Sequence, residues 1–157
     1  MKCLRKTFSE TGRILFTFAA IPLFLIHWFV SDIKNKLFGL IQSEKIELVA
    51  TQTKISLPIV ERMYRKMTAG VSFADIQIVD NAIMNGHHRY LASLLAGYAL
   101  GRYKGLRPDV KKNVDWKDIH VDGNDWDQPE EIARFDAEDA KLLGISVEEL
   151  HIIINNN

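Results

Sequence analysis

The spacing of hydrophobic residues changes several times along the chain, and each change predicts a different element. Residues 14–30 carry no charge and are apolar on every side of a helix. Residues 31–43 instead place isoleucine and leucine at helical spacing among lysines, which predicts a short amphipathic connector that either lies on a membrane surface or caps the core. Residues 45–50 alternate and are rich in β-forming types, so we expect a first strand there.

The next segment has the signals of an amphipathic helix. Ser56 is a favourable cap, Pro58 suits the first turn, and Gly70 is expected to end the helix. The apolar stripe of this helix consists of Val60, Met63, Tyr64 and Met67.

A tight hairpin and a packing helix are predicted after it. Ile76 and Ile78 share one face of a strand, and the pair Asp80–Asn81 tolerates positive φ, so the chain can turn back into a second strand. Asn85–Gly86 then breaks that strand, and a helix is expected from His87 to about Leu100. Its core-facing stripe consists of Leu91, Leu94, Leu95 and Tyr98.

The last third of the chain predicts a basic loop, a short strand and two helices. Residues 102–112 form the loop, Ile119 and Val121 suit the strand, and Pro129 begins the first helix with acidic residues in its first turn. The helical pair imitates a helix-turn-helix around residues 144–146. Its second helix carries two glutamates and no Lys or Arg, which is wrong for a phosphate-lined groove, so we interpret the pair as structural.

Composition narrows the choice of partners. The chain has 157 residues, enough for one core, with 20 Lys plus Arg and 20 Asp plus Glu, so a negatively charged partner must be held by a local patch. Cys3 is the only cysteine, which excludes an internal disulfide framework and a thiolate metal cluster. Trp116 and Trp126 are expected to seal the core.

The amino-terminal apolar run favours association with a membrane. It follows four basic residues and would form a helix about 26 Å long, slightly shorter than the hydrocarbon core. No small residues mark a cleavage site, so we expect the segment to be retained, with the amino terminus cytoplasmic and the rest across the membrane. The alternative is a buried core helix in a cytoplasmic protein or a secreted effector. We divide the chain into a hydrophobic, membrane-associated segment at 1–43 and a folded domain at 44–157.

The stretch "NGHHR" combines the features of a phosphate site. A helix that starts after a glycine turn presents unpaired N–H groups and the positive end of its dipole. The predicted phosphate-binding residues are Asn85, Gly86, His87, His88 and Arg89. Arg89 would supply a bidentate clamp, and His87 or His88 would move a proton near neutral pH, so the predicted catalytic residues are His87, His88 and Arg89. A plainer interpretation has the histidines cap the helix or pair with Asp75 or Asp80.

The pattern "IMNGHHRYLA" resembles the G-x-x-R-x-x-A signature of the ParB/sulfiredoxin superfamily, with Gly86, Arg89 and Ala92 at the three defining positions. The likeness covers roughly residues 45–101. The later "VDWKDIHVDGNDWD" resembles the ending of ParB-like domains in bacterial polymorphic toxins. The resemblance implies a nucleotide-binding α+β domain with a small mixed sheet and packed helices, here preceded by a hydrophobic helix. Sulfiredoxins place a catalytic cysteine where this chain has His87, so sulfinic acid reduction is not expected. The chain is also too short for the DNA-reading and dimerisation modules of ParB proteins.

Two further groups of residues are candidates for contacts with a ligand. Tyr90, Arg102 and Lys104 are the predicted contacts to a base or nucleic acid, with Tyr103 a second ring able to stack. Asp122 and His120 are the predicted ligands of a divalent cation such as Mg²⁺, although an EF-hand pattern is absent and solvated turn residues are the alternative.

These features lead to three hypotheses. The first is a bacterial ParB-like effector with phosphohydrolase or nuclease activity toward a nucleotide or nucleic acid. The second is a non-catalytic, nucleotide-controlled binding module. The third is a membrane-tethered interaction domain in which the turn has lost its function.

Overall fold

The computed structural model of the chain describes residues 23–106 and 112–156. Two small sheets and five α-helices make up this part of the chain, which is therefore α+β as expected. The helices are α1 (Leu23–Ile41), α2 (Leu57–Thr68), α3 (His87–Ala96), α4 (Pro129–Leu143) and α5 (Val147–Asn156). The strands are β1 (Lys54–Ser56), β2 (Ile76–Val79), β3 (Ala82–Asn85), β4 (Arg102–Lys104) and β5 (His120–Asp122), with a 3-10 turn at Trp116–Asp118.

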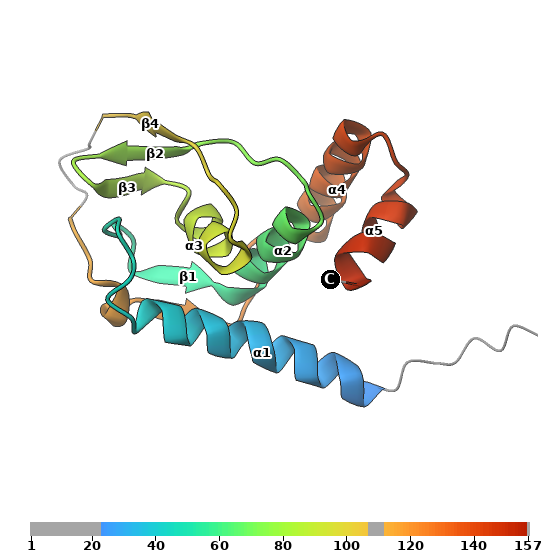
Figure 1. Cartoon of the computed structure of the whole chain (residues 1–157), viewed down its shortest axis with the longest axis horizontal. Coiled ribbons are helices and arrows are strands. Elements are labelled where there is room, and N and C mark those ends of the chain that lie inside the picture. The colour runs from blue at the N-terminus through green and yellow to red at the C-terminus, as the bar shows by residue number, and fades with distance from the viewer. Residues whose placement is uncertain (1–22, 107–111, 157) are drawn as a thin grey trace, which may run out of the picture.

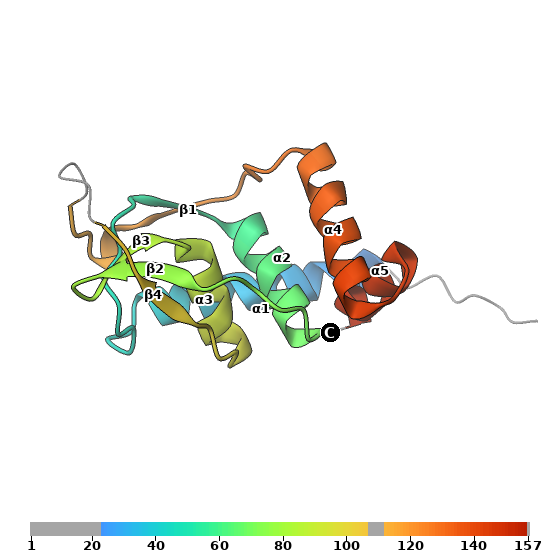
Figure 2. The same cartoon turned by 90° about the horizontal axis from the view of Figure 1, so that it is seen from above.

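Both sheets join segments that are distant in the sequence. One has the order β3-β2-β4, with β2 antiparallel to β3 and parallel to β4, and the other pairs β1 with β5 in parallel. The three-stranded sheet and the α4–α5 pair lie at opposite ends of the molecule, and α2 and α3 lie between them (Figures 1 and 2). The small mixed sheet predicted from the sequence is confirmed.

The predicted first strand is wrong. Residues 45–50 form two isolated bridges, from Val49 to Ala82 and from Ala50 to Val114, and the first true strand is β1, a few residues later. β1 has only three residues, and its partner strand, β5, lies more than sixty residues later in the sequence. Its formation depends on a pairing that the local sequence does not contain.

Local turn and cap signals are confirmed. The Ser56 side chain accepts a hydrogen bond from the Ile59 N–H at the start of α2. Asp80 and Asn81 have φ of 46° and 67° in the β2–β3 turn. Gly97, at φ 62°, ends α3 earlier than the predicted Leu100, because a left-handed residue stops the helical hydrogen bonds.

One core joins α1 to the rest of the fold. Leu37 and Ile41 are almost completely buried among residues of α2, the strands and α3, and Ile33 is also buried. The amphipathic connector thus caps the core, and the core cluster includes residues on both sides of the boundary predicted between residues 43 and 44. A smaller cluster holds α4 and α5 together around Ala140, Leu150 and Val71.

The structure describes only part of the apolar run at residues 14–30. Residues 14–22 lie outside the described residues, and residues 23–30 form the first turns of α1. Among the helices that the structure describes, none has the length and apolar character needed to cross a membrane.

Two predicted core positions are exposed. Trp126 is 40% exposed and Leu94 is 39% exposed, whereas Trp116 is buried and donates its indole N–H to the Leu48 carbonyl at 2.7 Å. Trp126 lies in the loop between β5 and α4, and its ring contacts that of His88 at the start of α3. The prediction that both tryptophans seal the core holds for Trp116 alone.

Candidate functional site

The turn between β3 and α3 requires glycine for two physical reasons. Gly86 has φ of 99°, a conformation that side chains disfavour. A Cβ atom at this position would lie 2.5 Å from Cγ2 of Ile76, a fully buried residue of β2. Gly86 is therefore required by both its backbone conformation and its packing against Ile76.

A cavity of about 430 Å³ opens at this turn. Its volume falls within the range of small-molecule sites, roughly 300–1,000 Å³. The residues that line it are Gln52, Met63, Met84, Asn85, Gly86, His87, His88 and Arg89. The five predicted phosphate-binding residues are thus brought to one cavity. Gln52 and Met63 were not predicted, and no local motif marks them, because they reach the site from the loop before β1 and from α2.

Arg89 is held at the cavity by backbone carbonyls. Its Nη1 atom donates to the Ala74 carbonyl at 2.8 Å and to the Asp75 carbonyl at 3.2 Å, and Nη2 lies against Gly86. No carboxylate of the described residues lies within 4.0 Å of the guanidinium, and Nε and Nη2 donate to no described residue. The side chain is thus fixed in direction while its positive charge stays uncompensated among these residues.

His87 is part of the core. Its side chain is almost completely buried, its Nε2 atom accepts a hydrogen bond from the Thr51 N–H at 3.0 Å, and its ring packs beside Trp116 at 6.3 Å between centroids. The ring of His87 thus holds residue 51 in place, an arrangement that does not favour its predicted catalytic role, although the residue also lines the cavity.

His88 lines the cavity as a neutral imidazole. Its Nε2 atom accepts from the Ser56 N–H at 2.9 Å, which assigns the remaining ring proton to Nδ1. Burial lowers the pKa of His88 to about 4, and the nearby Asp127 charge only partly opposes this effect. The ring is therefore neutral at pH 7 with its acceptor lone pair already used, an arrangement that does not favour the predicted general acid or base role. It keeps one donor, Nδ1–H.

The plainer interpretation of the histidines is also only half right. Both rings are structural partners, but they bond backbone amides of the segment before α2, and neither is paired with Asp75 or Asp80. Together they tie the first turn of α3 to residues 51–56.

The predicted contacts to a base are dispersed. Tyr90 is buried, and its hydroxyl accepts from the Leu48 N–H at 3.2 Å, so it cannot stack on a ligand. Arg102, Tyr103 and Lys104 form the exposed strand β4 and do not line the cavity. Arg102 is paired in a fork with Glu47, with distances of 3.1 and 2.9 Å, so its charge is largely compensated.

The predicted metal residues lie on β5. His120 is exposed, and Asp122 accepts hydrogen bonds from the Asn124 N–H and from the Trp126 indole N–H, at 2.9 and 3.1 Å. The Asn124 hydrogen bond, followed by that of Trp126, lowers the pKa of Asp122. Within the described parts of the chain, no group of three or more His, Cys, Asp or Glu side chains is arranged to hold a metal ion.

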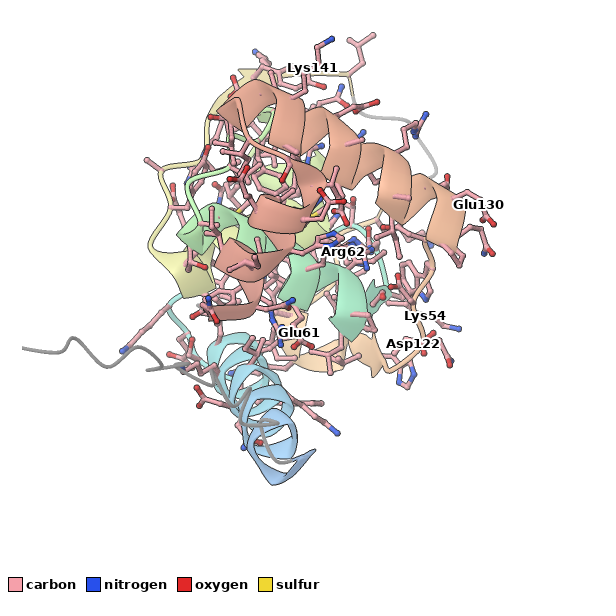
Figure 3. All side chains as sticks on the ribbon, turned by 90° about the vertical axis from the view of Figure 1, so that its right-hand side faces the viewer. Lys54, Glu61, Arg62, Asp122, Glu130 and Lys141 are labelled. Carbon is pink, nitrogen blue, oxygen red and sulfur yellow. The ribbon has the colours of Figure 1, made fainter. Side chains whose placement is uncertain are left out.

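A second cation, Arg62 of α2, anchors the loop beside the site. It donates to Asp125 at 2.7 Å and also pairs with Asp127. Figure 3 shows Arg62 on the helix behind α4, while Glu130 and Lys141 lie at the two ends of α4. No pattern in the sequence marks Arg62, because its partners are more than sixty positions away.

Comparison with protein-family models, with characterised proteins and with solved structures finds no match to this chain. The likeness to the ParB/sulfiredoxin superfamily therefore depends on the Gly86–Ala92 motif and on the order of the elements around it.

Proposed function

We propose that this chain binds the phosphate group of a nucleotide or nucleic acid in the cavity at the start of α3, and that it acts by binding without hydrolysing its ligand. The observation that carries the proposal is Arg89, a guanidinium fixed at the wall of a 430 Å³ cavity with no carboxylate of the described residues in contact. An uncompensated cation beside a cavity favours an anionic ligand.

The backbone supports the same ligand. The first helical hydrogen bond of α3 is donated by the Tyr90 N–H to the Gly86 carbonyl, so the preceding amides of the first turn have no acceptor within the helix. The helix dipole adds a partial positive charge at the same end. Phosphate oxygens would thus meet Arg89 and the first turn of α3 together.

The state of the two histidines favours binding over catalysis. Phosphodiester or nucleotide hydrolysis needs a group that positions or deprotonates the attacking water. His87 is buried, and His88 is neutral with Nε2 occupied by the Ser56 N–H. The binding module, the second of the hypotheses from the sequence, is therefore our conclusion, and hydrolysis is an outcome that the test includes.

The test is isothermal titration of the full-length chain with pyrophosphate, CTP, ATP and a short single-stranded DNA. We expect saturable binding of at least one of them, weakened by at least about tenfold in Arg89→Ala, because an ionic hydrogen bond contributes roughly 1.5–3 kcal/mol. Lys117→Ala is the matched control, since Lys117 is exposed and lies 3.7 Å from Glu44, outside the cavity.

Three results would count against the proposal. They are no binding of any of the four ligands, equal binding by wild type and Arg89→Ala, or release of product during the titration. Thermal melting of each variant shows whether a loss of binding reflects a loss of fold.

A further inference from the structure

Trp126 is held rigidly at the surface next to the cavity. Its ring meets His88 edge to face, with centroids 5.2 Å apart and planes at 89°, and His88 itself lines the cavity. The indole N–H donates to Asp122 at 3.1 Å. Although 40% of Trp126 is exposed, it is therefore oriented by contacts on two sides.

The loop that carries Trp126 is held by contacts of the residues before and after it in the sequence. Asp125 and Asp127, its two neighbours in the sequence, both pair with Arg62 of α2. The Ser56 side chain also donates to the Asn124 carbonyl at 2.9 Å, and Ser56 is fully buried. An exposed aromatic ring on so constrained a loop loses little conformational entropy when a ligand covers it.

The charges around the indole differ from those around Arg89. Asp122 accepts from the indole N–H, Asp125 and Asp127 adjoin Trp126 in the sequence, and the single charge of Arg62 compensates only part of the charge of these three carboxylates. A phosphate group is therefore disfavoured next to Trp126 and favoured next to Arg89. An uncharged ring that carries amino donors is suited to the acidic surroundings of Trp126. The volume of the cavity also exceeds what a phosphate group alone would fill.

We propose that Trp126 is a stacking platform for a nucleobase, so that the ligand is a base-bearing nucleotide whose phosphate lies at Gly86–Arg89. This inference rests on the proposed phosphate site. Aromatic side chains bind bases through their faces with little dependence on sequence, and the indole offers the largest such face.

The experiment compares three ligands that differ by one part each: AMP, ribose 5-phosphate and inorganic phosphate, titrated into the full-length chain. AMP is expected to bind at least about fivefold more tightly than ribose 5-phosphate, the lower end of the contribution of one stacked base. Trp126→Ala should remove that advantage and leave ribose 5-phosphate binding unchanged, while Trp126→Phe should retain most of it. Phe135→Ala is the matched control, because Phe135 is a similarly exposed ring on α4.

The outcomes separate the two proposals. Equal binding of AMP and ribose 5-phosphate, or an equal loss of both in Trp126→Ala, would overturn the stacking platform and leave the phosphate site standing. Absence of binding by all three ligands would overturn both. CMP in place of AMP shows whether the advantage depends on ring size.

Discussion

The Nε2 atom of His88 lies 2.9 Å from the backbone nitrogen of Ser56 and accepts its hydrogen bond. The same serine caps the start of α2, and its hydroxyl donates to the Asn124 carbonyl in the Trp126 loop. His88 is therefore a link between the first turns of α2 and α3. This relationship, together with burial, keeps the imidazole neutral.

The lowered pKa of His88 predicts how stability depends on pH. The folded-state pKa is about 4, and the ordinary value is 6.5, so between these values the unfolded chain binds more protons. Stability should therefore fall as pH decreases from about 6.5 toward 4, by about 2 kcal/mol at pH 5 from this group alone. Urea unfolding at pH 7.5 and pH 5 measures the loss.

The matched variant for this prediction is His88→Gln, whose side-chain oxygen can still accept from the Ser56 N–H. It should lose clearly less stability than wild type over the same pH interval, whereas His120→Gln, at an exposed position, should behave like wild type. An identical pH response in wild type and His88→Gln would show that His88 is not the group responsible.

Two glycines with positive φ allow backbone strain and steric clash to be separated. Gly86→Ala introduces both, because its Cβ would approach Ile76 within 2.5 Å, whereas Gly97→Ala meets nothing within 4 Å and introduces strain alone. We expect Gly97→Ala to cost about 1 kcal/mol and Gly86→Ala to cost clearly more, about 2–4 kcal/mol. Chemical denaturation measures both, and equal costs would mean that Ile76 moves aside without penalty.

The sequence predicts those features whose causes are local. The Ser56 cap, the Asp80–Asn81 turn and the glycine at position 86 each need only the chemistry of a few adjacent residues, and each is found where expected. The strand at residues 45–50 was not found, because Val49 and Ala50 each make a single bridge to a different segment and no continuous ladder forms with either one. The strand predicted at Ile119 and Val121 is found as β5, but its parallel pairing with β1 spans more than sixty residues and could not be predicted from either segment alone.

The candidate site shows the same division. Residues 85–89 were predicted as a cluster and do meet at one cavity. The protonation state of His88 and the burial of His87 depend on Ser56, Thr51 and the Trp126 loop, all distant in the sequence. The residue types indicated a proton carrier, whereas in the fold the Nε2 atoms of both rings accept hydrogen bonds from backbone N–H groups of Thr51 and Ser56.

A buried lysine of α2, Lys66, forms ion pairs with α4. We therefore expect the stability of the fold to depend strongly on its charge. Lys66 is 4% exposed and lies 2.7 Å from Asp136 and 2.6 Å from Asp139. Burial opposes ionisation of Asp136, but Lys66 and then His151 outweigh it, so the pKa of Asp136 is lowered overall. Lys66→Met leaves the carboxylates buried without their cation, and should destabilise the fold at pH 7 by about 3–5 kcal/mol.

The pH response distinguishes this effect from simple loss of packing. A carboxyl with a lowered folded-state pKa stabilises the fold above its ordinary value of 3.8, and that contribution is lost as pH falls below it. The difference in the free energy of unfolding between wild type and Lys66→Met should accordingly become smaller when urea unfolding is repeated at acid pH. Lys117→Met, at an exposed position, provides the comparison, and a difference that stays constant with pH would assign the loss to packing.

Adjacent residues of α1 test whether the amino-terminal helix belongs to the core. Leu37 is fully buried and Phe38 is 39% exposed. Leu37→Ala should lower the free energy of unfolding by about 2–5 kcal/mol, because it removes buried methyl groups and leaves a cavity, while Phe38→Ala should change it by less than about 1 kcal/mol. Urea unfolding of the full-length chain followed by circular dichroism measures both. Equal stability of the two variants would show that α1 is not part of the core and would support the predicted domain boundary between residues 43 and 44. If Leu37→Ala is the less stable, a fragment that begins at residue 44 lacks part of its own core.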